Sequence, residues 1–155
     1  MILVITGTHD QDFSRLIKEA DRLASKSREK FIMQTGHSET IPEHAEQFDF
    51  ADIEKMRSLI AKARVVITHG GIGSITDSLS HGKPTVVVPR RKMFGEHTND
   101  HQLDITKEME RQKMITAVYD IGELKKAVSS AKPPRRSIGR DSKAIEIIKD
   151  FLSNV

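Results

Sequence analysis

The segment from Val65 to Pro89 restricts the fold of this chain more than any other. Its first four residues form an apolar, β-branched run that predicts a buried strand. A glycine-rich turn, His69 to Ser74, follows at once, and then a short helical pattern leads to a second apolar strand at Thr85 to Val88. A strand, a tight glycine turn, a helix and another strand are typical of an α/β domain.

The same alternation runs along the whole chain. Continuous apolar strands separated by helices indicate a parallel sheet covered on both faces. We therefore expect one doubly wound, Rossmann-like α/β domain over residues 1–155. The predicted strands are Ile2–Thr6, Phe31–Gln34, Gln47–Phe50, Val65–Thr68, Thr85–Val88 and Ile115–Val118. The predicted helices are Asp12–Ser25, Ile53–Ala63, Ser74–His81, Asn99–Arg111, Ile121–Ser129 and Ile138–Leu152.

Length and composition narrow the class of protein. A chain of 155 residues suffices for one well-buried domain and is too short for two full α/β domains. The absence of cysteine excludes disulfides and cysteine metal sites, and it fits a reducing cytoplasm. The longest apolar runs, Met1–Ile5 and Thr85–Val88, are far shorter than the roughly 20 residues that span a bilayer. Because a strand opens the chain, we expect no signal peptide and a cytoplasmic location.

The net charge of +3 is too small an excess to indicate a nucleic-acid binder. The basic residues gather in the last quarter of the chain, around Pro133 and Pro134. This cluster is either a solvated linker before the last helix or a patch that faces anionic lipid or a partner subunit. RNA binding is the weaker interpretation, because no aromatic residues are interleaved with the cations. The cluster comprises Lys125, Lys126, Lys132, Arg135, Arg136, Arg140 and Lys143.

The glycine-rich turn suits an anionic ligand. Glycine lets a backbone pass close to a ligand, and the new helix directs unpaired N–H groups and its positive dipole end at that spot. Asp77 lies about one turn deeper, where its carboxylate would accept hydrogen bonds from sugar hydroxyls. The turn is neither a dinucleotide fingerprint nor a P-loop, and a plain tight connection is the alternative. A nucleotide-sugar, held by its diphosphate and its ribose, is the leading ligand.

In doubly wound sheets a ligand binds at the carboxyl ends of the strands, where the strand order reverses. The loops that follow the predicted strands therefore hold the candidate site. These loops are residues 6–10, 36–38, 50–52, 69–74 and 89–101.

Several short motifs follow one another along nearly the whole chain. They are Gly7-Thr8-His9, Phe13-Ser14-Arg15-Leu16, Thr68-His69-Gly70-Gly71, Gly82-Lys83-Pro84, Val88-Pro89-Arg90, Gly95-Glu96-His97 and Asn99-Asp100-His101-Gln102. In their order and spacing, these motifs resemble the glycosyltransferase family 28 C-terminal domain family. That family is the donor-binding half of two-domain B-type glycosyltransferases, and it includes stand-alone capsule and exopolysaccharide subunits and the small subunit of the split dolichol-linked transferase.

The resemblance implies a residue for each part of a UDP-sugar donor. Asp77 matches the acidic ribose-binding position, where the family often has the longer Glu. Phe50 and Ala51 match the loop whose backbone recognises uracil, although this loop is about two residues longer here than in the peptidoglycan enzyme of the family. The residues that match the sugar contacts are Asp100, His101 and Gln102. Those that match the diphosphate cradle are Gly7, Thr8, His69, Gly70, Gly71, Gly73 and Ser74.

For several other charged or titratable residues the sequence allows both a functional and a structural role. Arg90 either contacts donor phosphate or a uronic acid, or belongs to a solvated loop. Glu96 and His97 are open to a role as caps of the following helix, for which Asn99 is also suited. His9 is either the general base or a structural loop histidine. The carboxylates and histidines lack metal-ligand spacing, so we expect a reaction without metal or cofactor, in which helix and backbone donors stabilise the leaving UDP.

The resemblance also implies that the acceptor-binding half of the enzyme is on another polypeptide. A separate, membrane-anchored subunit would bind a lipid diphosphate-linked acceptor and hold this chain at the cytoplasmic membrane face. The last helix carries an apolar stripe that either packs on its own domain, the default, or docks on that partner. The stripe consists of Ala144, Ile145, Ile148, Phe151 and Leu152.

The alternative function is a non-catalytic nucleotide-binding module that stimulates a partner glycosyltransferase.

Overall fold

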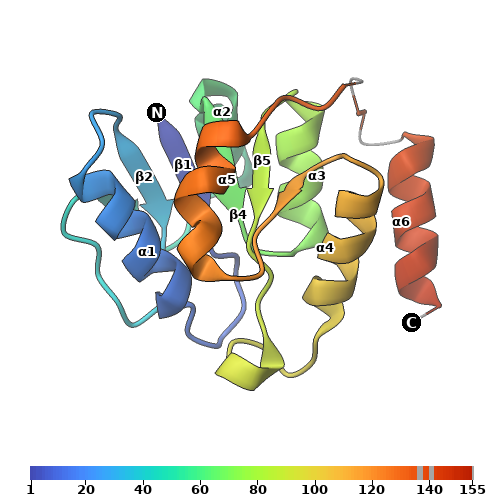
Figure 1. The fold of residues 1–155 in the computed structure, drawn as a ribbon, viewed down its shortest axis with the longest axis horizontal. Helices are drawn as coiled ribbons and strands as arrows, with labels where there is room; N and C mark the ends of the chain where they lie inside the picture. Colours follow the sequence, from blue (N-terminus) through green and yellow to red (C-terminus); the bar gives the residue numbers. More distant parts are fainter. Residues whose placement is uncertain (136–137, 140–141, 155) are drawn as a thin grey trace.

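A computed structural model describes residues 1–135, 138–139 and 142–154, in which helices alternate with strands along the chain (Figure 1). Its core is a six-stranded sheet in the order β3-β2-β1-β4-β5-β6, and neighbouring strands pair in parallel. The predicted doubly wound, Rossmann-like fold is confirmed. The strands are β1 (Ile2–Ile5), β2 (Phe31–Gln34), β3 (Glu46–Phe48), β4 (Val65–Thr68), β5 (Thr85–Val87) and β6 (Thr116–Ala117).

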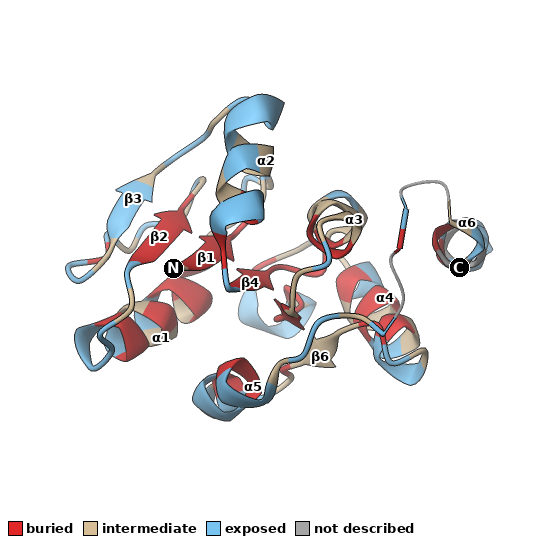
Figure 2. Ribbon diagram, turned by 90° about the horizontal axis from the view of Figure 1, so that it is seen from above, coloured by how far each residue is buried: buried red, intermediate tan, exposed pale blue. Residues whose placement is uncertain are grey.

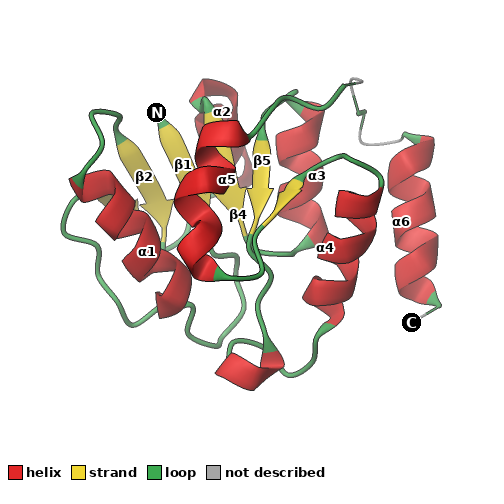
Figure 3. Cartoon of the chain, in the orientation of Figure 1, coloured by secondary structure: helices red, strands yellow, loops and turns green. Residues whose placement is uncertain are grey.

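Helices cover both faces of the sheet (Figures 2 and 3). Apolar side chains of α1 and α5 share one buried cluster with alternate residues of the strands, such as Ile2 and Val4. The other residues of β1, Leu3 and Ile5, pack with α2 on the opposite face. The helices are α1 (Ser14–Ser25), α2 (Ile53–Lys62), α3 (Ile72–Ser80), α4 (His101–Arg111), α5 (Leu124–Ser130) and α6 (Lys143–Ser153), with 3₁₀ turns η1 (Lys92–Phe94) and η2 (Ile121–Glu123).

Four helices begin later than the sequence predicts, including α4 at His101 rather than Asn99 and α5 at Leu124 rather than Ile121, whereas α3 begins earlier, at Ile72 rather than Ser74. The first was predicted from Asp12 but begins at Ser14, because the Asp12 carboxylate accepts hydrogen bonds from the backbone N–H and the hydroxyl of Ser14. The last was predicted from Ile138 but begins at Lys143, after Ser142, whose hydroxyl oxygen accepts from the N–H of Ile145. Both boundaries are set by a side chain that bonds the first free N–H groups of the helix.

The last helix packs on its own domain. Ile145 and Ile148 are buried in the same apolar cluster as Met109 of α4. Phe151 of the predicted stripe is 38% exposed. The side chains of Ala144 and Leu152 lie outside the described part, as do Arg136 and Arg140 of the basic cluster.

The strand order reverses between β1 and β4. From β1 the chain continues to β2 and β3 toward one edge of the sheet, and from β4 it continues to β5 and β6 toward the other edge. At this switch point the loops after the two strands diverge and leave a crevice at the carboxyl end of the sheet. In the described ranges, no helix has the length and apolar character that crossing a bilayer requires.

Replacing Ile148 with alanine tests the packing of α6. Because Ile148 is fully buried against the α4 cluster, the Ile148→Ala change is expected to lower the free energy of unfolding by about 2–4 kcal/mol. Phe151→Ala on the same helix is the control and is expected to cost less than about 1 kcal/mol. Urea unfolding measures both, and equal losses would contradict this packing.

Candidate functional site

A pocket of about 340 Å³ lies at the switch point of the sheet. It is bounded by the loop after β1, by the segment that leads into α2 and by the first turns of α3. The structure thus joins segments that are separated by up to about half the chain. The site residues expected from the sequence that line this pocket are Gly7, Thr8, Phe50, Ala51, His69, Gly71, Gly73, Ser74 and Asp77.

The imidazole of His69 forms one wall of the pocket, and two glycine backbones rest against it. A Cβ at Gly7 would lie 2.5 Å from His69 Nε2, and a Cβ at Gly71 would lie 2.1 Å from His69 Cε1. Gly7 also has a φ of +85°, in the left-handed region that side chains disfavour. Glycine is therefore required at both positions by close approach to the ring, before any ligand is considered.

His69 is neutral in this environment. Burial, followed by the positive charge of Arg90, lowers the pKa of His69 to about 3. Its Nδ1 lies 3.1 Å from Gln102 Nε2, and its Nε2 lies 3.0 Å from Ser74 Oγ. The ring thus connects the start of α4 to a hydroxyl in the pocket.

The start of α3 supplies unpaired N–H groups to the pocket. Gly71 is the N-cap residue of α3, and it has no side chain to bond the first N–H groups of the helix. Gly73 and Ser74 line the pocket in the first turn. Backbone donors and the positive end of the helix dipole therefore face the same space, an arrangement that favours an anion.

Asp77 lies one turn further along α3 and also lines the pocket. Its Oδ1 is 3.9 Å from Nε of Arg57 on α2, so a guanidinium partly balances its charge. Apolar side chains also line the pocket, among them Phe50, which is about half exposed, and Ile53, which is 65% exposed. The pocket therefore combines backbone donors, a carboxylate and an apolar surface.

Gln34, at the end of β2, holds two pocket loops together and was not singled out from the sequence. Its Oε1 accepts from the N–H groups of Thr6 (3.0 Å) and Gly7 (2.9 Å). Its Nε2 donates to the carbonyls of Gly7 (3.0 Å) and Asp49 (2.9 Å). A polar residue that ends an otherwise apolar strand was the available signal.

The residues expected to contact the transferred sugar lie away from the pocket lining. Gln102 is buried, and its Oε1 accepts from the N–H groups of Gly70 (2.9 Å) and Arg90 (3.1 Å). Gly70 packs against α4, where a Cβ would lie 2.7 Å from Cβ of Gln102. Asp100 accepts from the N–H of Lys92 at 3.0 Å, and His101 is exposed at the start of α4.

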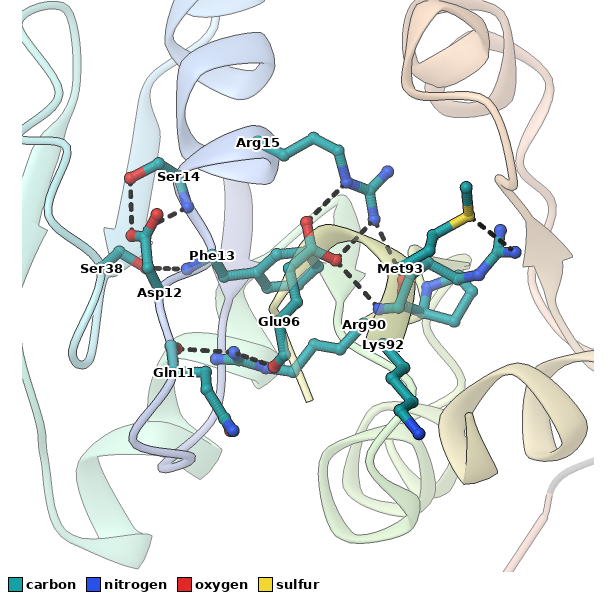
Figure 4. Close-up of polar contacts among 12 residues, drawn as sticks. Gln11, Asp12, Phe13, Ser14, Arg15, Ser38, Arg90, Lys92, Met93 and Glu96 are labelled. Carbon is teal, nitrogen blue, oxygen red and sulfur yellow. Dashed lines mark hydrogen bonds and ion pairs between the residues drawn. The ribbon is translucent and has the colours of Figure 1, made fainter. Parts of the chain in front are cut away.

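Arg90 is buried rather than part of a solvated loop, with 1% of its surface exposed. Its guanidinium donates to the carbonyls of Thr6 (2.8 Å), Gln11 (2.8 Å) and Glu96 (3.0 Å), as Figure 4 shows for the last two. It also lies 4.7 Å from the centre of the Phe13 ring. Although burial lowers the pKa of Arg90 to about 10, the group stays charged at neutral pH and fastens the loop after β1 to the loop after β5.

The buried carboxylate of Glu96 forms an ion pair with Arg15, the third residue of the Phe13-Ser14-Arg15-Leu16 motif (Figure 4). Its carboxylate accepts from Arg15 Nε at 2.7 Å and from Arg15 Nη2 at 3.0 Å. It also accepts from the N–H of Arg91 at 3.0 Å. Glu96 therefore ties α1 to the loop after β5. The N-cap residue of α4 is Asp100, which makes no side-chain capping bond, and the N–H of His101 donates instead to Asn99 Oδ1 at 3.0 Å.

His9 lies beside this loop, outside the pocket lining. Its ring centre is 4.2 Å from that of His97, and its Nδ1 accepts from the N–H of Gln11 at 3.4 Å. Burial and the charge of His9 lower the pKa of His97. Among the described residues, no group of three or more histidines and carboxylates is arranged to hold a metal ion.

The six-stranded parallel sheet with helices on both faces is the Rossmann-like fold of the glycosyltransferase structures that superpose on this chain. The family model for the glycosyltransferase family 28 C-terminal domain matches residues 1–155. The chain therefore belongs to this family.

Known proteins of this kind are similar to the chain. The UDP-N-acetylglucosamine transferase subunit ALG13 of Homo sapiens is 31% identical over 96 residues, which are 59% of this chain and 8% of the human protein. A UDP-N-acetylglucosamine--N-acetylmuramyl-(pentapeptide) pyrophosphoryl-undecaprenol N-acetylglucosamine transferase of Thermosipho melanesiensis is 26% identical over 99% of this chain and 46% of its own length. The chain thus spans less than half of either relative. The solution structure of ALG13 superposes with a TM-score of 0.59 at 17% identity, over 88% of this chain and 89% of that one.

The contact between Gly71 and His69 gives a stability test. Gly71→Ala is expected to lower the free energy of unfolding by about 2–4 kcal/mol, because the new Cβ would overlap the imidazole. At Gly73 a Cβ would meet no described atom within 4 Å. Gly73→Ala is therefore expected to keep or raise stability. Thermal unfolding of both variants measures the difference, and equal melting temperatures would contradict the close contact between Gly71 and His69.

Burial of neutral His69 predicts a loss of stability in mild acid. The unfolded chain has a His69 pKa near 6.5 and the folded chain one of about 3, so the unfolded state binds more protons below pH 6.5. The free energy of unfolding should therefore fall by up to about 1 kcal/mol per pH unit between pH 6.5 and 5. Urea unfolding of the wild type and of His69→Gln measures this, and the variant should show the shallower slope. Identical slopes would overturn the prediction.

Proposed function

We propose that this chain is the donor-binding subunit of a UDP-sugar glycosyltransferase that transfers a hexose to a lipid diphosphate-linked acceptor. One observation carries the proposal. The residues assigned to diphosphate, ribose and uracil come from three distant segments, and all of them except Gly70 line a single pocket at the switch point. Membership of the family and the UDP-N-acetylglucosamine transferases among its relatives support this assignment.

Each part of the donor has a matching surface. The diphosphate would lie against the N–H groups at the start of α3, beside Gly7 and Thr8. The ribose would lie along α3, within reach of the Asp77 carboxylate. The uracil would lie against the apolar wall near Phe50 and Ala51, where backbone groups are within reach.

The reaction follows from where charge develops. The acceptor hydroxyl attacks the anomeric carbon of the sugar while the bond from that carbon to the UDP oxygen breaks, which inverts the configuration. Negative charge grows on the departing diphosphate, and the backbone donors of α3 stabilise it there. The proton of the acceptor hydroxyl passes to a base, for which His9 on this chain and a group on a partner are the candidates.

The acceptor site is proposed to lie on a second, membrane-anchored subunit. The chain spans 8% of the human relative and 46% of the bacterial one, and the human relative is named as a subunit. Such a partner would hold this chain at the cytoplasmic face of the membrane and complete the cleft.

Binding of UDP to the isolated chain tests the donor role. Asp77→Ala is expected to weaken UDP binding about tenfold, because a charge-assisted hydrogen bond to the ribose is lost. Calorimetry with UDP and with 2′,3′-dideoxy-UDP on both proteins locates the contact. The wild type should discriminate between the two ligands, and Asp77→Ala should not. Equal affinities of the wild type for the two ligands would contradict the ribose assignment.

Reconstitution tests the catalytic role. The isolated chain is expected to transfer sugar at least about a hundredfold more slowly than the chain with its acceptor subunit, because proximity of acceptor and donor is lost. Release of UDP measures the rate. Full activity without a partner would overturn the split enzyme. Full transfer by a Gly73→Val variant that no longer binds UDP would favour the non-catalytic module.

A further inference from the structure

Gln102 begins a hydrogen-bond chain that ends in the pocket. Its Oε1 accepts from the backbone N–H groups of Gly70 and Arg90, at 2.9 and 3.1 Å. A backbone N–H only donates, so the amide oxygen must face these two groups and the amide nitrogen must face away from them. The orientation of the Gln102 amide is thus fixed by the backbone.

The amide nitrogen in turn fixes the proton on His69. Gln102 Nε2 lies 3.1 Å from His69 Nδ1. Because an amide nitrogen only donates, Nδ1 must accept, and the neutral ring carries its proton on Nε2. Burial keeps the ring neutral at physiological pH, since the pKa of His69 is lowered to about 3.

The protonated ring nitrogen fixes the Ser74 hydroxyl. His69 Nε2 lies 3.0 Å from Ser74 Oγ and donates to it, which uses a lone pair of that oxygen. The hydroxyl proton must then point away from the ring. Since Ser74 lines the pocket in the first turn of α3, this proton is available to a ligand there.

We propose that Gln102 and His69 are positioning residues for the Ser74 hydroxyl. They orient this hydroxyl so that it donates a hydrogen bond to an unprotonated oxygen of an ionised phosphate in the ligand. The identity of the phosphate rests on the donor-binding function proposed above. The order of donors and acceptors in the free protein does not depend on that function.

Nitrogen NMR of the free protein tests the first part. The Nδ1 of His69 is expected to show the shift of a bare nitrogen and Nε2 that of a protonated one, unchanged from pH 8 to pH 5. A proton on Nδ1, or a doubly protonated ring at pH 7, would overturn the proposal. This measurement needs no ligand.

A double-mutant cycle tests the second part. Gln102→Glu keeps an acceptor for both backbone N–H groups but places an acceptor opposite Nδ1, so that a proton should move to Nδ1. UDP affinity should fall about tenfold in Gln102→Glu and about tenfold in Ser74→Ala. If Gln102 acts through Ser74, then Gln102→Glu should cost at least threefold less in the Ser74→Ala background. The electrostatic effect of the new carboxylate is common to both backgrounds.

Thr76→Ala is the matched control on the same helix, because the Thr76 hydroxyl donates to the Ile72 carbonyl and lies outside the pocket lining. Its UDP affinity should equal that of the wild type. If the fold-losses of UDP affinity caused by Gln102→Glu and Ser74→Ala simply multiply in the double variant, the proposal is overturned. If the wild type fails to bind UDP, the donor role fails, while the NMR result still decides the order of hydrogen bonds.

Discussion

The geometry of the site depends on one contact. Two glycine backbones pack closely on the buried imidazole of His69. A Cβ at either Gly7 or Gly71 would overlap the ring. The loop after β1 and the start of α3 can therefore approach each other only because both positions lack a side chain. The pocket between them, the free N–H groups of α3 and the orientation of Ser74 all depend on this contact.

The fold could be predicted because its signals are local. Strands buried on both faces are continuous apolar runs, and the helices between them leave little choice of architecture. The starts of the first and last helices were misplaced, because single bonds from Asp12 and Ser142 determine them. Periodicity shows which face of a helix is apolar, but it does not show where a side chain interrupts the helical hydrogen bonds.

The pocket lining could be predicted from short motifs that follow strands, because the carboxyl ends of parallel strands meet at one edge of the sheet. The turn at Gly71 and the carboxylate of Asp77 are six residues apart, and they line one pocket as expected. The roles of Arg90 and Glu96 depend on partners up to 84 residues away, so sequence reasoning left Arg90 open to a phosphate contact or a solvated loop. For the same reason Gln102 was assigned to a sugar contact, whereas its amide is bonded within the protein. Charge and residue type do not reveal burial.

Gln34 bonds the loop after β1 to the segment before α2 within this one chain. Arg90 bonds the same loop to the loop after β5, which the Arg15–Glu96 pair also ties to α1. The loops around the pocket are therefore held by bonds within this one chain. In the two-subunit transferase proposed above, nucleotide loading and subunit assembly would then occur in either order. The amount of the second subunit would set the rate of transfer, because donor subunits with bound nucleotide would already be present.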